Sequence, residues 1–125
     1  MSRRLGGPAV ALAAIAVGLL SAPAATAHDP ECDIILPAAD DLEAVFDQIR
    51  PGRMPVQGTE AQIVAAQSPL FGLTSPAAVD LRLWSSTLAA EVNRVNPYRP
   101  AGPDRIARDL AQARRQLTAA RQYCR

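Results

Sequence analysis

Apolar residues recur at helical spacing in the C-terminal part of the chain, where the pattern is clearest. From residue 106 to residue 124 the spacing alternates between four and three, as in a helix that packs along other helices through a narrow seam. The preceding Gly102-Pro103 is a suitable start, because proline is favoured at the first helical position. The seam consists of Ile106, Leu110, Ala113, Leu117, Ala120 and Cys124.

A second long helix is predicted from Pro76 to about residue 95. Ser75 stands at the capping position, Pro76 takes the first helical position, and Asn96-Pro97 ends the run. An apolar stripe of this kind is typical of a helix with one buried face. The stripe consists of Ala77, Leu81, Trp84, Leu88, Val92 and Val95.

Two shorter helices are predicted earlier in the chain. The first begins near Asp40, which forms a capping-box-like pair with Glu43, and it ends at Pro51-Gly52. The second begins at Thr59 and ends at Ser68-Pro69. No stretch alternates apolar and polar residues as a half-buried strand would. We therefore expect an all-α fold, a small bundle of three to four helices with short loops.

The N-terminal segment has the three parts of a cleavable secretory signal. Arg3 and Arg4 form the charged start, residues 9–20 an apolar run, and Ala25-Thr26-Ala27 a small-residue cleavage site. The apolar run is shorter than the ~20 residues that a membrane-spanning helix needs. We expect cleavage after residue 27, which leaves residues 28–125 as one helical domain without a transmembrane segment. The protein is then secreted or held in the cell envelope or periplasm.

Cys32 and Cys124 are the only cysteines, and they stand near opposite ends of the expected mature chain. Two cysteines in an exported protein most simply form one disulfide, whereas redox and metal-binding pairs usually lie close in sequence. In the chain-entropy model, a loop of this length stabilises the fold by ~4.6 kcal/mol. Because Cys124 belongs to the seam of the last helix, its sulfur should point inward. We therefore expect one disulfide to close the bundle from its N-terminal to its C-terminal end.

Charge is distributed unevenly along the chain. Residues 28–47 hold seven carboxylates and no arginine, whereas residues 94–125 hold eight arginines and two carboxylates. The disulfide would bring these two segments together, so we expect them to neutralise each other in part. All 13 basic residues are arginine, which together with abundant alanine is typical of a GC-rich, actinobacterial-like composition.

The sequence offers little catalytic chemistry. The only histidine, His28, would be the first residue of the mature chain, so neither a Ser-His-Asp nor a Cys-His nucleophile can form within the fold. No glycine-rich phosphate loop and no zinc-type ligand cluster is present. A terminal histidine can chelate copper, but the second histidine that such sites recruit is missing. We therefore predict no catalytic residue, no metal site and no cofactor.

The size of the chain and its terminal cysteine pair resemble small exported haem-carrying helical domains of actinobacteria. The resemblance implies an iron ligand within the fold, and the conventional candidates are Tyr98, Tyr123 and Met54. Exported chorismate mutases are another helical class, which uses several arginines with a glutamate and a lysine. Because this chain has no lysine and no histidine inside the fold, its residues carry neither family assignment.

Two pairs of residues are candidates for contacts with a ligand or partner. Tyr98 and Arg99 lie in a proline-rich loop and belong to residue types enriched at interface hot spots. Arg108 and Arg115 are seven residues apart and share a helix face, so they could hold an anion. The scattered aromatic residues argue against nucleic acid as a partner.

The leading functional hypothesis is a non-enzymatic module that binds a protein or a small apolar ligand. The alternative is an enzyme or carrier that binds a small anionic or haem-like ligand through arginines of the last helix. The two hypotheses differ in what the arginines contact. Arginines paired within the protein favour the first hypothesis, whereas a concave pocket lined by unpaired arginines and a buried carboxylate favours the second.

Overall fold

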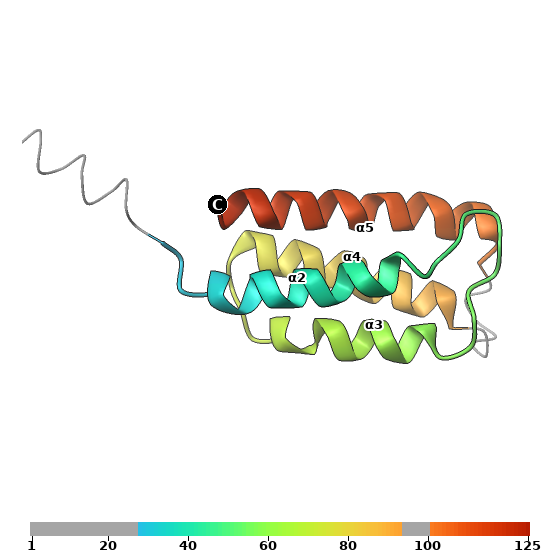
Figure 1. Cartoon of the computed structure of the whole chain (residues 1–125), viewed down its shortest axis with the longest axis horizontal. Coiled ribbons are helices and arrows are strands. Elements are labelled where there is room, and N and C mark those ends of the chain that lie inside the picture. Colours follow the sequence, from blue (N-terminus) through green and yellow to red (C-terminus); the bar gives the residue numbers. More distant parts are fainter. Residues whose placement is uncertain (1–27, 94–100) are drawn as a thin grey trace, which may run out of the picture.

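The computed structural model describes residues 28–93 and 101–125 (Figure 1). These residues form four α-helices and one short 3₁₀-helix, and they contain no strand, which confirms the predicted all-α bundle. The predicted signal and the loop with Tyr98 and Arg99 lie outside the described residues. The helices are α2 (Cys32–Phe46), α3 (Thr59–Gln67), η1 (Ser68–Leu70), α4 (Pro76–Val92) and α5 (Pro103–Tyr123).

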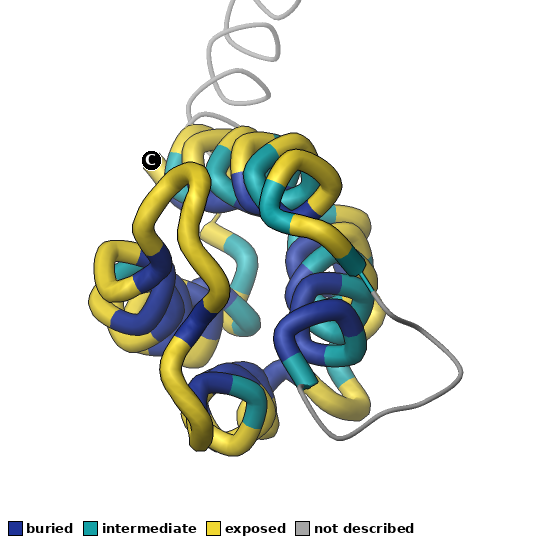
Figure 2. Tube along the Cα trace, turned by 90° about the vertical axis from the view of Figure 1, so that its right-hand side faces the viewer, coloured by how far each residue is buried: buried dark blue, intermediate teal, exposed yellow. Residues whose placement is uncertain are grey.

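Successive helices run antiparallel, so that α2 and α4 point one way while α3 and α5 point the other (Figure 1). Seen along the bundle, the four helices form a ring in which α2 and α4 each contact both α3 and α5 (Figure 2). This arrangement places the N-terminus of α2 beside the C-terminus of α5. The connection between α2 and α3 lies at the opposite end of the bundle.

The core is built from the inward faces of all four helices, which Figure 2 shows as buried segments facing one another. Removing this apolar surface from water is the main stabilising contribution to a fold of this kind. Phe46, near the C-terminal end of α2, is the largest fully buried side chain. Seven other large side chains are at most 1 % exposed: Ile35, Leu42, Ile63, Leu70, Leu81, Leu88 and Ile106.

The predicted apolar seam of the last helix is confirmed. All six of its residues are buried, and even Cys124, the most exposed of them, retains only 7 % exposure. Gly102 is the N-cap of α5, and Pro103 is the first residue of the helix. Backbone N–H groups in the first helical turn have no acceptor within the helix, so the N–H that proline lacks is not needed there. α5 therefore presents one continuous apolar edge to α2 and α4.

α4 starts where the sequence predicts, with Ser75 at the N-cap and Pro76 as its first residue. The helix ends at Val92, since Asn93 has an extended backbone (φ −74°, ψ 100°), so α4 is shorter than the predicted span. Of the predicted stripe, Leu81, Leu88 and Val92 are buried, Ala77 and Trp84 are partly buried, and Val95 lies outside the described residues.

The prediction for the first helix is wrong about both of its ends, since α2 also stops at Phe46, before the predicted end at Pro51-Gly52. α2 begins at Cys32, well before Asp40, so Asp40 and Glu43 lie inside the helix instead of capping it. The apolar face extends back through buried Ile35 to Cys32, and this burial stabilises the additional turns. Pro37 stands within these turns, although proline cannot donate a backbone hydrogen bond to the helix. Tertiary packing thus outweighs the local signals on which the prediction relied.

α3 has the predicted bounds, and a tight turn sets its start. Gly58 precedes it with a positive φ of 96°, a conformation that favours glycine. The buried Thr59 hydroxyl donates a hydrogen bond to the carbonyl of Val56 at 2.7 Å, which fixes the first residue of the helix. After Gln67 the chain continues as η1, which buries Leu70 against the core.

Leu81 and Leu83 offer a matched test of the core, since both belong to α4. Leu81 has no exposed surface, whereas Leu83 is 57 % exposed. We expect Leu81→Ala to lower the free energy of unfolding by about 2–5 kcal/mol, because it leaves a cavity. Leu83→Ala should change that free energy by less than about 0.5 kcal/mol. Urea unfolding followed by circular dichroism measures both variants, and equal losses would contradict this packing.

Candidate functional site

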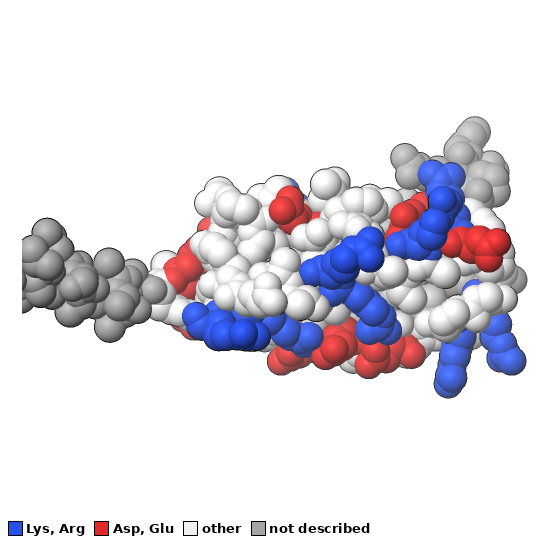
Figure 3. All heavy atoms as spheres, turned by 90° about the horizontal axis from the view of Figure 1, so that it is seen from above, with Lys and Arg blue, Asp and Glu red and all other residues white. Residues whose placement is uncertain are grey.

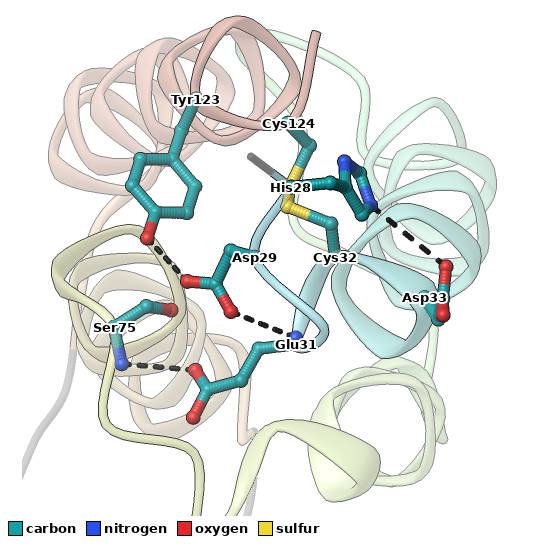
Figure 4. The surroundings of a disulfide bond; sticks show 8 residues. All are labelled: His28, Asp29, Glu31, Cys32, Asp33, Ser75, Tyr123 and Cys124. Carbon is teal, nitrogen blue, oxygen red and sulfur yellow. Dashed lines mark hydrogen bonds and ion pairs between the residues drawn. A yellow bond between two sulfur atoms is a disulfide. The ribbon is translucent and has the colours of Figure 1, made fainter. Parts of the chain in front are cut away.

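A disulfide joins Cys32, the first residue of α2, to Cys124, the residue that follows α5 (Figure 4). The two Cα atoms are 5.5 Å apart, and both side chains are buried. The predicted bond is therefore confirmed. Because both side chains are shielded from solvent, the bond is placed to hold the fold together and not to exchange with other thiols.

Tyr123 and Asp29 add a polar contact beside the disulfide (Figure 4). The Tyr123 hydroxyl donates a hydrogen bond to Oδ2 of Asp29, while Oδ1 of Asp29 accepts the backbone N–H of Glu31 at 2.8 Å. The bond to Asp29 raises the pKa of Tyr123, because it favours the protonated phenol. The segment before α2 is thereby attached to the last turn of α5.

Glu31 links the start of α2 to the start of α4. Its carboxylate accepts the backbone N–H of Ser75 at 2.9 Å (Figure 4). It also accepts the backbone N–H of Thr74 at 3.0 Å and the Thr74 hydroxyl at 3.3 Å. These backbone hydrogen bonds, which favour the ionised carboxylate, lower the pKa of Glu31 from 4.5 to about 2. The N-terminus of α4 also favours a negative charge through the helix dipole. No sequence motif relates Glu31 to residues 74 and 75, so the contact was missed at the sequence level.

The acidic face of α2 pairs with arginines of α5, as the charge distribution predicts. Arg121 contacts Asp40 at 2.8 Å and Glu43 at 3.0 Å, and Arg114 contacts Asp47 at 2.9 Å. Figure 3, which views the molecule from the α5 side, shows carboxylates gathered along one long edge beside arginines. The hydrogen bonds to Asp40 and Glu43 raise the pKa of Arg121. This side of the bundle therefore neutralises much of its own charge.

A further ion pair lies near the other end of α5. Arg105 Nε is 3.2 Å from Oε2 of Glu91, whose side chain is only 3 % exposed, whereas Arg105 is 60 % exposed. A buried carboxylate is costly without a cationic or hydrogen-bonding partner. The sequence offered no signal for this pair, since the two residues belong to different helices. Arg105 is therefore the third α5 arginine that a carboxylate of the same chain neutralises.

Arg108 and Arg115, the predicted anion-binding pair, are exposed on α5. Arg115 donates from Nε to Oε1 of Gln112 at 2.9 Å. Within the described residues, neither arginine forms an ion pair with a carboxylate. Two guanidinium groups on an open helix surface can attract an anion, but they do not enclose it. Tyr98 and Arg99, the other predicted contact residues, lie outside the described residues.

Among the described residues, those considered for metal or haem do not come together. His28 Nε2 lies 3.9 Å from Asp33, and no group of three or more potential metal ligands exists among the described residues. Tyr123 is bonded to Asp29 at the disulfide end, whereas Met54 lies in the α2–α3 connection at the opposite end (Figure 1). The described part of the chain therefore does not place these two candidate iron ligands around a common centre.

Val64 of α3, Leu83 of α4 and Phe71, which follows η1, are three exposed apolar side chains that we group as the α3–α4 patch. They retain 42 %, 57 % and 56 % exposure, respectively. A hydrogen bond between Ser86 and Gln67 at 3.1 Å joins the two helices. Val64 lies one helical turn before Gln67 in α3, and Leu83 lies one turn before Ser86 in α4. The only sequence signal for the patch is that Leu83 falls outside the apolar stripe of α4.

Arg82 completes the α3–α4 patch. Its guanidinium carbon lies 5.4 Å from the centre of the Phe71 ring, which is a cation–π geometry. Phe71 follows η1 and Arg82 belongs to α4, so this contact connects the end of η1 to the second turn of α4. The ring is thus held in a defined position although it is more than half exposed.

Comparison with known proteins identifies no relative, because no protein-family model matches the chain and no curated protein or solved structure matches it significantly. The chemistry of the described residues is therefore the basis for any functional assignment. Within that part of the chain, no helix combines the length and the apolar character that a bilayer-spanning segment requires.

The contribution of the disulfide can be measured by removing both cysteines. We expect Cys32→Ala/Cys124→Ala to lower the free energy of unfolding by ~2–5 kcal/mol, because the unfolded chain regains the freedom that the closed loop denies it. Alanine avoids leaving a buried hydroxyl without a partner. The reduced wild-type protein is the control and should unfold at a similar urea concentration. A loss below about 1 kcal/mol would contradict the structural role.

Glu31 predicts a specific dependence of stability on pH. Since folding lowers its pKa from 4.5 to about 2, the ionised carboxylate stabilises the fold fully above pH 4.5 and loses that effect as pH falls toward 2. We expect Glu31→Gln to be less stable than the wild type at neutral pH. The difference in unfolding free energy should shrink steadily from pH 4.5 to pH 2, which urea titrations at several pH values measure. A difference that does not change with pH would refute this role.

Proposed function

We propose that this protein is a non-enzymatic binding module that acts in the cell envelope or outside the cell, and that its partner is another protein. The observation that carries the proposal is the α3–α4 patch, where Val64, Phe71 and Leu83 remain substantially exposed. Exposed apolar patches on otherwise polar surfaces mark interaction sites. The patch would become buried when the partner binds.

The composition of the patch supports a protein contact. Aromatic residues and arginine are the residue types that contribute most to binding at protein interfaces. Phe71 and Arg82 are such a pair, and their stacking orders the ring before any partner arrives. A side chain that is already ordered loses less conformational entropy on binding.

The charges elsewhere favour this proposal over a small anionic or haem-like ligand. Arg105, Arg114 and Arg121 each contact a carboxylate of the same chain, so their attraction for an external anion is reduced. Arg108 and Arg115 are both exposed, and two exposed guanidinium groups attract an anion without enclosing it. Arginines that are paired with carboxylates of the same chain are what we expect of a binding module that does not bind an anionic ligand.

The partner should present an apolar surface with little net charge. Residues 59–92, which include α3 and α4, contain only three carboxylates and one arginine. One of the carboxylates, Glu91, is buried against Arg105. Three apolar side chains form a small contact, so we expect a transient complex and not an obligate one.

Site-specific photo-crosslinking tests the proposal. A benzophenone amino acid replaces Phe71 or Leu83 in the full-length chain, which its native host then exports. We expect both positions to crosslink to the same partner protein, identified by mass spectrometry, because both side chains face that partner. The Phe71→Ser/Leu83→Ser variant should then lose affinity for the purified partner by more than about tenfold.

The same amino acid at Val56 is the matched control. Val56 is 63 % exposed but lies in the α2–α3 connection, away from the patch. A crosslink at Val56 equal to those at the patch would indicate non-specific contact. Failure of both patch positions to give a discrete crosslinked product would contradict the proposed interface. Unchanged thermal unfolding of Phe71→Ser/Leu83→Ser would show that lost binding does not reflect lost folding.

A further inference from the structure

The connection between α2 and α3, residues 48–58, lies at the end of the bundle opposite the disulfide (Figure 1). It contains two arginines, Arg50 and Arg53, and no carboxylate. It also exposes two aliphatic side chains, Met54 at 45 % and Val56 at 63 %. We call these eleven residues, 48–58, the basic loop. The basic loop has two arginines and no aromatic residue, whereas the α3–α4 patch has one arginine, Arg82, which lies over the Phe71 ring.

Buried residues fix the position of the basic loop. Ile49 is only 4 % exposed and Pro55 is also buried, so the chain is held to the bundle on both sides of Arg53. The N–H of Arg53 donates to the carbonyl of Arg50 at 3.3 Å, across a turn in which Gly52 has a positive φ of 75°. The loop therefore presents its arginines and Met54 from an ordered turn.

The arginines of the basic loop differ from those of α5 in their pairing. Within the described residues, neither Arg50 nor Arg53 forms an ion pair, whereas Arg105, Arg114 and Arg121 each do. Carboxylates flank the loop in sequence. Asp47 is bonded to Arg114, and Glu60 stands in the first turn of α3. Figure 3 shows arginine side chains projecting from the molecule at this end. The positive charge of the loop is thus not neutralised by a direct contact.

We propose that the basic loop is a peripheral docking element for an anionic phospholipid surface of the cell envelope. Guanidinium groups bind phosphate through paired hydrogen bonds, which suits Arg50 and Arg53 to lipid headgroups. Met54 and Val56 enter the boundary between headgroups and acyl chains, where exposed apolar side chains are removed from water. Two arginines and two aliphatic side chains give weak, reversible attachment.

The chemistry of the loop favours a lipid surface over other anionic partners. Its exposed apolar residues are aliphatic, whereas single-stranded nucleic acid is bound through aromatic stacking. An acidic protein would be held by the arginines alone, and it would leave Met54 and Val56 exposed to water. A bilayer offers a partner to each kind of side chain, phosphate groups to the arginines and the acyl-chain boundary to Met54 and Val56. The bundle would then stand with its disulfide end away from the membrane and the α3–α4 patch on its side.

Vesicle co-sedimentation of the oxidised protein, purified from the medium of its native host, tests this inference. Vesicles of equal parts phosphatidylglycerol and phosphatidylcholine are compared with pure phosphatidylcholine vesicles at low salt. We expect binding only to the anionic vesicles, and it should weaken as salt is added. Arg50→Gln/Arg53→Gln should reduce the partition coefficient about 25-fold, since each arginine near an anionic surface contributes about fivefold. Met54→Ser/Val56→Ser should also reduce it.

Arg108→Gln/Arg115→Gln is the matched control, because it removes the same charge from exposed arginines of α5. It should change the partition coefficient by less than about twofold; a loss equal to that of the loop variant would show unspecific charge attraction and overturn the proposal. Binding to polyglutamate but not to vesicles would indicate an acidic protein partner instead. Absence of wild-type binding to anionic vesicles would also refute the inference.

This docking element does not depend on the protein interface proposed above. Phe71→Ser/Leu83→Ser should retain wild-type vesicle binding, whereas the loop variants should retain the crosslinks formed from the patch. Each proposal can therefore fail without the other. All substituted residues are exposed, and thermal unfolding of every variant verifies that the fold is intact.

Discussion

The covalent bond between Cys32 and Cys124 sets the register of α5 against α2, and the charge pairs follow from that register. The two helices run antiparallel from the disulfide, so residues farther along α2 face residues earlier in α5. Arg121, close to the bond, accordingly meets the middle of α2, and Arg114, two turns earlier, meets Asp47 just beyond its end. A sliding of one helix by a single turn would separate every one of these pairs. The disulfide prevents such sliding.

The bundle consequently has two unlike sides and a distinct end. Where α2 meets α5, Arg114 and Arg121 pair with carboxylates of the same chain, which reduces the charge that this side offers to a partner. α3 and α4 are joined by a neutral hydrogen bond between Gln67 and Ser86, and they leave apolar side chains in water. The basic loop has two arginines without an ion pair among the described residues, beside the exposed aliphatic side chains of Met54 and Val56. The α3–α4 patch and the basic loop are therefore the parts of the described surface where we expect partners to bind.

The sequence predicts this fold well wherever apolar spacing and helix-capping signals agree. The seam ending at Cys124 and the start of α4 at Pro76 have both signals, and both are confirmed. The predicted start of α2 is wrong because the local signal at Asp40 competes with burial that only the assembled bundle provides. Contacts between distant residues, such as Glu31 with the N-terminus of α4, have no local signature. The α3–α4 patch has only a partial signature, since Leu83 falls outside the apolar stripe of α4 but nothing in the sequence relates it to Phe71 or Val64.

The position of the disulfide also has a consequence for proteolysis of the folded protein. The two cysteines are 92 residues apart, so almost every described peptide bond lies within the covalent ring that they close. A single cut in the basic loop or in the turn before α4 would open the ring but leave both fragments joined through Cys32 and Cys124. The fragments would stay packed, because the helices on either side of the cut retain their contacts. A nicked molecule would therefore keep its mass, apart from one added water, and both of its surfaces.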